Sequence, residues 1–369
     1  MAKAFGIITS SAEHKVDGLQ DYRPIGSFSF LGRYRVIDFP ISNLSNSGII
    51  NQQVYIASKA RSMIAHIGTG RHYNINSKRG RLQLLPPTEE KVNDIYNTNI
   101  RAMYENLEYI KRQSQEYVVI VPSCMVFRQD YDALLQGHAA SGADITALYH
   151  TVHHAKSGYE TCHIFDIADG KVNAIRRNHG DEDVRAISME SFIMKKSLLI
   201  KLIGEARAIS SMYNLSDVIN AKIGDLDVRA VEHFGYFGPI TSLKSYYDAN
   251  KQLLDPAKAA DLFTPDWPIY TRTNDSCPSQ YYDSAEVKNS LISNGCEIHG
   301  TIEDSVIARG VVIGKGAVIK GCYISAYTTI GENVCLENQV VDKYVTIDHE
   351  NKITAPAEKP GYIRYMDNL

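Results

Sequence analysis

Residues 307–353 read IARGVVIGKGAVIKGCYISAYTTIGENVCLENQVVDKYVTIDHENKI, and one spacing repeats through them. Aliphatic residues recur six positions apart in groups of three, and successive groups start at Ile307, Ile324 and Val341, so the period is constant. A coil with three short faces needs one inward aliphatic side chain per face, and stacked coils bury what a single coil leaves exposed. The spacing therefore predicts a left-handed parallel β-helix with inward-facing Ile307, Ile313, Ile319, Ile324, Ile330, Leu336, Val341, Ile347 and Ile353.

The repeat continues less regularly towards the N-terminus. Cys296 and Ile302 stand one period before two of the aliphatic positions, which indicates an irregular first coil. Gly314 and Gly331 directly follow aliphatic positions, as small residues do in hexapeptide repeats. We expect a β-helix domain of three to four coils over residues 286–369.

A β-helix of this kind is compatible with several functions. It occurs as an acyltransferase scaffold, as a trimerisation module and as a tail on nucleotidyltransferases. Acyltransferases use a basic His near a coil junction, and the His residues of this region are His299 and His349. A His in such a loop is more often only solvated, so the N-terminal part of the chain has to decide the function.

Residues 1–250 carry a different pattern, in which short apolar runs alternate with helical stretches. The runs are apolar throughout, which suits strands of a parallel sheet that is covered on both faces. This predicts an α/β domain, followed by a linker over residues 251–285. Ligands of such sheets bind beyond the carboxyl ends of the strands. The expected strands are Ala4–Ile8, Gln53–Ala57, Tyr117–Val121 and Asp144–Tyr149, with a helix within Asn97–Arg112.

The composition is that of an ordinary globular chain. A formal net charge of -3 over 369 residues gives no indication of a nucleic-acid or membrane partner. No apolar run approaches the roughly 18 residues of a membrane span, and the N-terminus does not resemble a signal peptide. The six cysteines form no C-x-x-C pair, so we expect neither a zinc site nor disulfides, and a cytoplasmic location. The 23 tyrosines are the unusual figure, and no catalytic role explains them.

Two segments carry a family resemblance. Gly32–Ile49, GRYRVIDFPISNLSNSGI, resembles the motif G-K-Y-R-I-I-D-F-x-L-S-N-C-x-N-S-G-I of ADP-glucose pyrophosphorylases (glucose-1-phosphate adenylyltransferases). Ser242–Leu254, SLKSYYDANKQLL, is similar to that family's T-I-D-A-Y-W-E-A-N-M-D-L-L. With the β-helix tail, the resemblance covers essentially the whole chain. It implies a nucleotidyltransferase-like Rossmann domain with a mixed, mainly parallel sheet, followed by the β-helix, in a tetramer that serves bacterial glycogen synthesis.

The family's catalytic parts are altered at their counterparts here. In that family a sugar 1-phosphate attacks the α-phosphorus of ATP, and a Gly-rich loop, basic side chains and carboxylate-held Mg²⁺ stabilise the developing charge. The loop after the first strand has no glycine where the family has G-G-x-G-x-R-L; it contains Ser10 and adds the carboxylate Glu13. Ile25 stands where the resemblance implies a phosphate-binding Lys. Cys124 and Pro239 stand where it implies two metal-binding Asp residues.

The loss of one such charge-stabilising group typically costs about 10²–10³ in rate. We therefore expect no catalytic residues, no bound metal and no cofactor in this chain. It resembles the non-catalytic, GlgD-type regulatory subunits of the family, which associate with an active glucose-1-phosphate adenylyltransferase subunit. The alternative that stays open is a weakly active or differently specific sugar-1-phosphate nucleotidyltransferase.

Further positions are matched to binding roles by the resemblance. Arg23 and Arg35 align with arginines that bind phosphorylated effectors at the domain junction in the family, and Arg33 is a further candidate for the same site. The expected ligand is a phosphorylated sugar. Ser188 and Asp217 are expected in a vestigial substrate pocket. The resemblance also implies a homo- or hetero-tetramer.

Overall fold

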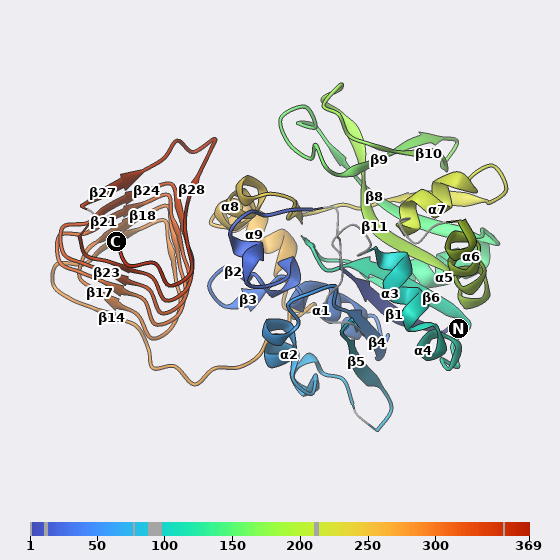
Figure 1. Ribbon diagram of the computed structural model, residues 1–369, viewed down its shortest axis with the longest axis horizontal. Coiled ribbons are helices and arrows are strands. Elements are labelled where there is room, and N and C mark those ends of the chain that lie inside the picture. Colours follow the sequence, from blue (N-terminus) through green and yellow to red (C-terminus); the bar gives the residue numbers. More distant parts are fainter. Residues whose placement is uncertain (1, 11–13, 77, 88–97, 210–213, 350) are drawn as a thin grey trace.

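The computed structural model describes residues 2–10, 14–76, 78–87, 98–209, 214–349 and 351–369. An α/β domain and a β-helix lie side by side, and the C-terminus belongs to the β-helix (Figure 1). The predicted fold class is confirmed for both parts of the chain. Within the described ranges, no helix is long and apolar enough to cross a membrane.

A nine-stranded mixed sheet forms the centre of the α/β domain. Four neighbouring strands at one side are parallel, and the next strand, β11, runs antiparallel to both of its main neighbours. All four predicted strands are present, as β1, β4, β6 and β8. The order across the sheet is β5 (Arg81–Leu85), β4 (Asn51–Tyr55), β1 (Ala4–Thr9), β6 (Tyr117–Pro122), β11 (Arg185–Lys195), β8 (Ile145–Val152), β12 (Val228–Glu232), β10 (Lys171–Arg177) and β9 (His163–Ala168).

Helices cover both faces of this sheet. Phe5 and Val118 pack into the hydrophobic cluster on one face, whereas Ile8 and Val121 pack into the cluster on the other. This two-sided burial explains why the strand sequences are apolar throughout. The first cluster includes residues of α3 (Asn99–Glu105), α4 (Leu107–Lys111), α6 (Lys196–Ile209) and α7 (Leu215–Ala221), and the second includes residues of α1 (Asp38–Asn46), α2 (Arg61–Ile67), α5 (Tyr131–Ser141), α8 (Leu243–Gln252) and α9 (Pro256–Leu262).

The helix that was expected within Asn97–Arg112 is divided into α3 and α4. The break lies at Asn106, whose side-chain amide donates to the Ala102 carbonyl at 2.9 Å; Asn97 itself lies outside the described residues. The remaining short elements of the domain are η1 (Leu19–Asp21), η2 (Ile25–Ser27), η3 (Arg71–Tyr73), β2 (Ser29–Phe30), β3 (Tyr34–Arg35), β7 (Met125–Phe127) and β13 (Phe237–Pro239).

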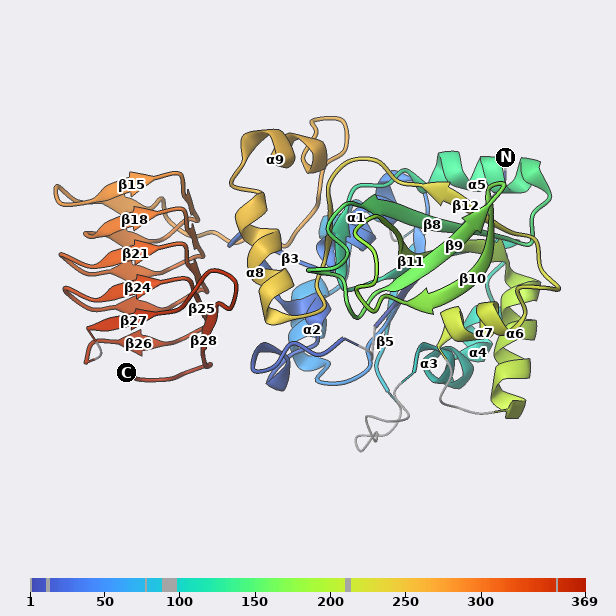
Figure 2. The same ribbon diagram turned by 90° about the horizontal axis from the view of Figure 1, so that it is seen from above.

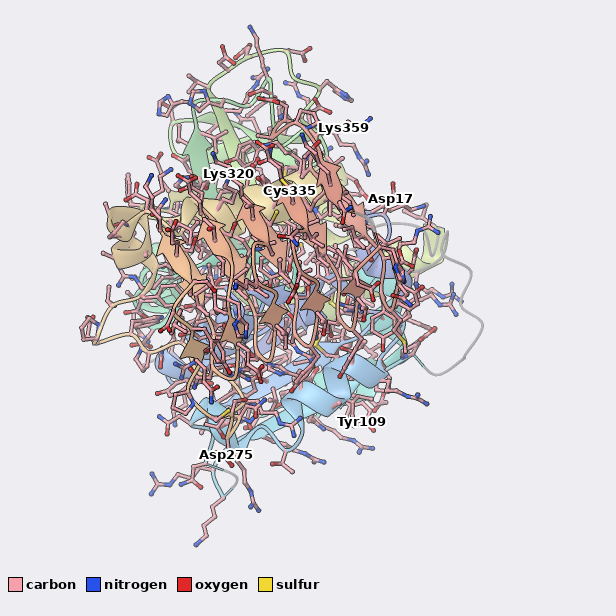
Figure 3. The ribbon with its side chains drawn as sticks, turned by 90° about the vertical axis from the view of Figure 1, so that its left-hand side faces the viewer. Asp17, Tyr109, Asp275, Lys320, Cys335 and Lys359 are labelled. Carbon is pink, nitrogen blue, oxygen red and sulfur yellow. The ribbon has the colours of Figure 1, made fainter. Side chains whose placement is uncertain are left out.

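The β-helix consists of three parallel sheets of five strands each. Figure 2 shows the strands stacked as successive coils, and Figure 3 shows an outer face, on which Lys320 and Cys335 lie. The three sheets are β14 (Gln280–Tyr281), β17 (Glu297–Ile298), β20 (Val312–Ile313), β23 (Thr329–Ile330), β26 (Thr346–Ile347); β15 (Glu286–Lys288), β18 (Thr301–Glu303), β21 (Val318–Lys320), β24 (Cys335–Glu337), β27 (Lys352–Thr354); and β16 (Leu291–Ile292), β19 (Val306–Ile307), β22 (Tyr323–Ile324), β25 (Gln339–Val341), β28 (Gly361–Ile363).

Three details of the β-helix differ from the sequence prediction. Five strands per sheet make more coils than the expected three to four. Ile298, and not Cys296, pairs with Ile313, because the step between these two coils is shorter than the regular period. The segment 251–285, expected as a linker, contains α9 and the first β-helix strand, which begins at Gln280.

The two domains meet through the outer face of the third sheet. Ile307 and Ile324 point into the β-helix core, whereas their neighbours Val306 and Tyr323 belong to the core cluster of the α/β domain. Figure 2 shows α8 between the β-helix and the rest of the α/β domain. The ring of Tyr246 meets Tyr323 edge-on with centroids 5.2 Å apart.

Tyr247 and Gly32 also contribute to this interface between the two domains. The Tyr247 hydroxyl donates to the Gly321 carbonyl at 2.6 Å. Gly32 lies so close to the β-helix that a Cβ there would approach the Ala308 backbone to 3.0 Å. Tyr provides a large apolar ring with one polar tip, which suits such a half-polar contact. Part of the high tyrosine content therefore serves the packing of the two domains.

Candidate functional site

A small cavity lies at the carboxyl ends of β1 and β6, where the sheet topology places a ligand. Its volume is about 20 Å³. The Ser10 hydroxyl in its wall donates to the Tyr55 carbonyl at 2.8 Å and accepts from the Ala57 amide at 3.3 Å, so this side chain joins β1 to β4. Residues 11–13, with Glu13, lie outside the described residues. The lining residues are Thr9, Ser10, His14, Asn99, Pro122, His163, Glu190 and Asn214.

A carboxylate is held in the wall of this cavity. Glu190 accepts hydrogen bonds from His163 Nδ1 at 2.6 Å and from Ser216 Oγ at 2.9 Å. Burial alone would raise the pKa of Glu190, but the charge and hydrogen bond of His163 and the Ser216 hydroxyl hold it below its ordinary value. Because the carboxylate separates the hydroxyl from the imidazole, these three groups do not form a nucleophile–base pair.

His14 adds no positive charge at neutral pH. Its burial lowers the pKa of the imidazole to about 4, so the ring is neutral at pH 7. A phosphate in this cavity would therefore gain no attraction from His14, and the charge of His163 is already paired with Glu190. The lining of this cavity therefore provides no excess positive charge for a phosphate.

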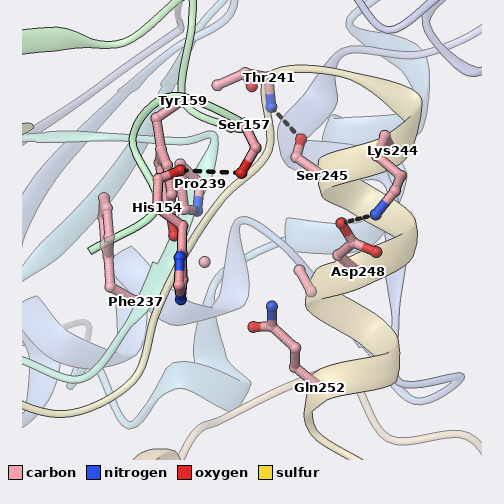
Figure 4. Close-up of a pocket in the computed structure, with 13 residues that line it drawn as sticks. His154, Ser157, Tyr159, Phe237, Pro239, Thr241, Lys244, Ser245, Asp248 and Gln252 are labelled. Atoms are coloured by element: carbon pink, nitrogen blue, oxygen red, sulfur yellow. Dashed lines mark hydrogen bonds and ion pairs between the residues drawn. The ribbon is translucent and has the colours of Figure 1, made fainter. Parts of the chain in front are cut away.

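A second cavity, of about 330 Å³, lies between β13 and α8. Figure 4 shows Lys244 and Asp248 joined as an ion pair on α8, with Phe237 and His154 opposite them. Pro239 also lines this cavity. Because Lys244 and Asp248 compensate each other, the ion pair provides no excess positive charge for a phosphate.

A third cavity, of about 530 Å³, lies at the junction of the two domains and has a strongly basic lining. The α/β domain contributes Arg33 in the β2–β3 turn, Arg35 in β3 and His66 on α2. The segment that connects α9 to β14 contributes Arg272 and Asp275, and the β-helix contributes Arg309 and Lys343. The charged residues of the lining are Arg33, Arg35, Arg272, Asp275, Arg309 and Lys343. Five cations against one carboxylate make this cavity a site for an anion.

The period of the β-helix creates one wall of this basic cavity. Arg309, Ala326 and Lys343 stand one period apart from each other, so they occupy the same corner in successive coils. The Tyr327 amide donates to the Arg309 carbonyl, and the Tyr344 amide donates to the Ala326 carbonyl, which continues the ladder across the corner. The small Ala326 leaves room between two long cationic side chains.

Electrostatics show that these cations are crowded. Burial and the neighbouring Arg35 and Arg23 charges lower the pKa of Lys343 to about 7. Burial also lowers the pKa of Arg35 and of Arg309, and in each case a nearby cation adds to the effect. Arg35 Nη1 donates to the Ser62 carbonyl at 2.7 Å, which fixes its guanidinium in the cavity wall. A bound anion would relieve the repulsion among these groups.

Comparison with known proteins places these features in a family. Residues 22–255 match the nucleotidyl transferase family, and residues 277–360 match the C-terminal hexapeptide region of GlmU-like proteins. The chain is 32% identical over 313 residues to the glucose-1-phosphate adenylyltransferase of Clostridium perfringens (strain 13 / Type A), which is 82% of this chain and 77% of that protein. The chain belongs to the ADP-glucose pyrophosphorylase family.

Two further relatives carry the name glycogen biosynthesis protein GlgD. The chain is 28% identical over 361 residues to the protein of Bacillus subtilis (strain 168), which is 97% of this chain and 95% of that protein. It is 30% identical over 319 residues to the protein of Geobacillus stearothermophilus, which is 86% of this chain and 83% of that protein. The similarity to these GlgD-type members of the ADP-glucose pyrophosphorylase family therefore extends along nearly the whole chain.

Cys124 and Pro239, which the sequence resemblance matches to two metal-binding Asp residues, lie side by side. β13 pairs with β7 so that Pro239 is opposite Met125, and the Ile240 amide donates to the Cys124 carbonyl at 2.8 Å. The Cys124 side chain is buried in the core, and proline has no ligand atom in its side chain. Mg²⁺ requires oxygen ligands, so these two residues do not fit it. Within the described part of the chain, no group of three or more His, Cys, Asp or Glu residues could hold a metal ion.

Three other positions that the sequence analysis singled out have structural contacts. Ile25 lies in η2 and is buried in the core of the α/β domain. Ser188 is fully buried, and its hydroxyl accepts from the Glu190 amide at 3.1 Å. Asp217 caps α7 by accepting from the Asn214 amide at 3.0 Å. Ser188 and Asp217 were expected in a vestigial substrate pocket, but neither lines the three cavities described above.

Two of the three expected effector residues, Arg33 and Arg35, lie in the basic cavity. Arg23 does not line it. Its guanidinium instead donates to both carboxylate oxygens of Asp342, at 2.8 and 2.9 Å, and so joins the α/β domain to the β-helix. The sequence prediction missed three cations of the lining, namely Arg272, Arg309 and Lys343. The period of the β-helix, which relates Arg309 to Lys343, was the available signal.

Proposed function

We propose that this chain is a regulatory, catalytically impaired subunit of glucose-1-phosphate adenylyltransferase in glycogen biosynthesis, and that it modulates an active partner subunit. The observation that carries this proposal is the pair of metal positions, Cys124 and Pro239, which are adjacent and lack carboxylate oxygens. Glu190 supports the same conclusion, because it pairs with His163 at the carboxyl ends of β1 and β6 and leaves no excess positive charge there for a phosphate. Because the family's chemistry depends on stabilising phosphate charge, this chain lacks the groups that lower the barrier.

The regulatory part of the proposal rests on the basic cavity. A phosphorylated sugar is the ligand class that we propose for it, because several charge-assisted hydrogen bonds are available from Arg33, Arg35 and Arg272. Arg309 and Lys343 reach the same cavity from the β-helix. A bound phosphate would therefore contact both domains and favour one arrangement of them, which is how an effector changes a subunit assembly.

The proposed assembly is a homo- or hetero-tetramer that includes the catalytic subunit, in the cytoplasm. The 28–32% identity to both GlgD proteins and adenylyltransferases supports a common architecture for the two subunit types. The cysteines are scattered along the sequence without a C-x-x-C pair, a pattern that favours a reducing compartment.

The first prediction concerns catalysis. We expect the purified chain to form ADP-glucose from ATP and glucose 1-phosphate at least about 10³-fold more slowly than the active subunit of the same organism, because more than one charge-stabilising group is missing. Mixed with that subunit, it should change the rate or the effector half-saturation of the partner. A coupled pyrophosphate-release assay measures both, with each subunit alone at equal concentration as the control. Robust turnover by the purified chain would contradict the proposal and favour the alternative of an independent nucleotidyltransferase.

The second prediction concerns the effector site. Replacing Arg35 with Ala should raise the half-saturating concentration of a phosphorylated-sugar effector of the mixed complex roughly tenfold to a hundredfold, since hydrogen bonds to charged groups contribute about 1.5–3 kcal/mol. Effector titration of the mixed complex measures this, and size-exclusion chromatography checks that assembly is retained. Arg81→Ala, an exposed arginine at the far edge strand β5, serves as the matched control and should leave the titration unchanged. An unchanged half-saturation in Arg35→Ala would count against the basic cavity as the effector site.

A further inference from the structure

Glu190 has a backbone conformation that glutamate rarely adopts. Its φ is +49°, in the left-handed region, and the pairing of β11 with β8 shifts register between Ser188 and Phe192 on either side of it. A residue with a Cβ is disfavoured in this region, and such residues persist where the surrounding structure or a function requires them. Glycine would take the same position without strain. The bulge in β11 therefore keeps a charged side chain at a backbone position that favours glycine.

The carboxylate of Glu190 is fixed from two sides. His163, at the start of β9, and Ser216, in α7, are its hydrogen-bond partners at 2.6 and 2.9 Å. The side chain is only 18% exposed. Two partners from separate elements hold the carboxylate in one place, so its negative charge has a defined position in the site.

This position lies at the carboxyl ends of β1 and β6, the edge of the sheet at which ligands bind in folds of this type. Glu190 lines the same cavity as Thr9 and Ser10, which end or follow β1, and Pro122, which ends β6. In sheets of this type, phosphate groups bind beyond the carboxyl ends of these strands. A carboxylate resembles part of a phosphate in charge and in its hydrogen-bond acceptors, so the two compete for one space and repel each other.

We propose that Glu190 is an internal anion that occupies the phosphate region of the vestigial nucleotide site and excludes phosphorylated ligands from it. The loss of catalysis that we propose for this chain would then include loss of nucleotide binding, and the bulge in β11 is the backbone device that places the excluding group. The inference rests on the proposed function, since it concerns the site that has lost its activity.

The test is ATP binding by the full-length chain, measured by titration calorimetry at constant ionic strength. We expect Glu190→Gln, which keeps the size of the side chain and removes its charge, to bind ATP at least tenfold more tightly than the unaltered chain. Glu190→Gly should give a similar or larger gain, because the side chain is absent and glycine tolerates the left-handed conformation. The basic cavity is the same in all these proteins, so a difference in ATP binding between them arises from the substitution at position 190.

The matched control is Glu303→Gln in the β-helix. Glu303 also accepts from two side chains, Lys288 at 3.0 Å and Lys320 at 3.3 Å, but it lies in the other domain. The Glu303→Gln variant should bind ATP with the same affinity as the unaltered chain. If both Glu190 variants fold, as judged by circular dichroism, and bind ATP no better than the Glu303 variant, the inference is overturned. Should Glu190→Gly fail to fold, Glu190→Gln alone decides.

The outcome can be separated from that of the proposed function. The regulatory proposal is judged on turnover by the unaltered chain and on its effect in the mixed complex. If the unaltered chain shows no regulatory effect but the Glu190→Gln variant binds ATP more tightly, the regulatory proposal is overturned and the role of Glu190 is supported. If the unaltered chain has the regulatory effect but the Glu190 variants bind ATP no more tightly, the regulatory proposal is supported and the role of Glu190 is overturned.

Discussion

Replacing Arg23 with Ala is expected to lower the free energy of unfolding by about 3–5 kcal/mol, which is large for one side chain. The Arg23 guanidinium and the Asp342 carboxylate form a bidentate pair between the domains, and their side chains are 6% and 0% exposed. In the variant the buried carboxylate would lose its bidentate cation and keep the hydrogen bonds from the Tyr362 hydroxyl and the Lys343 backbone amide. An uncompensated buried charge costs more than the intact pair contributes. Urea unfolding followed by circular dichroism measures the difference.

Two further variants make this prediction specific. Lys201→Ala removes one partner of an exposed ion pair with Glu205 on α6 and should change stability little. The double variant Arg23→Met with Asp342→Leu should recover much of the loss, because apolar side chains of similar volume can replace a buried ion pair. If Arg23→Ala is no more destabilising than Lys201→Ala, Asp342 is not an essential tether between the domains.

The β-helix could be predicted from sequence because its determinants are local and periodic. Each inward position, such as Ile313 or Ile330, is buried by residues one period away, so the spacing alone identifies the column. The prediction missed a coil at the N-terminal end, where the step from Ile298 to Ile313 is shorter than the regular period and the aliphatic pattern loses its spacing. A shorter turn at one corner changes the number of residues in the coil without changing which side chains face the core.

The basic cavity was only partly predictable. Arg33 and Arg35 are close in sequence and carry the family resemblance, whereas Arg272 comes from the connecting segment and Arg309 and Lys343 from the β-helix. Their convergence depends on how the third sheet of the β-helix packs on α8, which no local pattern encodes. The same long-range contact gives Arg23 a partner 319 residues away, Asp342, in place of the expected effector.

Glu190 was not singled out by sequence for a related reason. Nothing in a run of strand residues marks one of them as left-handed, and its partners His163 and Ser216 come from other elements. Cys124 and Pro239, in contrast, could be singled out, because the sequence resemblance matches them to residues with carboxylate oxygens, which a thiol and a proline side chain lack.

Anion binding in the basic cavity is expected to weaken steeply above pH 7. The Lys343 amine has a pKa of about 7 in the free chain, below its usual value of 10.5, because of burial and the nearby Arg35 and Arg23 charges. A bound anion favours the protonated amine and raises this pKa, so binding takes up a proton above pH 7 and none well below it. Affinity should therefore be level near pH 6 and fall by up to about tenfold per pH unit between pH 7 and 9.

Sulfate is the appropriate probe, because its own charge does not change over this range, and titration calorimetry at constant low ionic strength gives the affinity at each pH. The other ionisable groups that face the cavity are Arg33, Arg35, Arg272, Arg309, His66, Asp275, Tyr34 and Tyr327. Lys343→Gln should abolish the decline above pH 7, and Lys343→Arg should keep the affinity high up to pH 9, since a guanidinium remains charged. A decline that persists unchanged in Lys343→Gln would show that another of these groups titrates. The pH profile thus tests whether the amine contributed by the β-helix takes part in binding together with the arginines of the α/β domain.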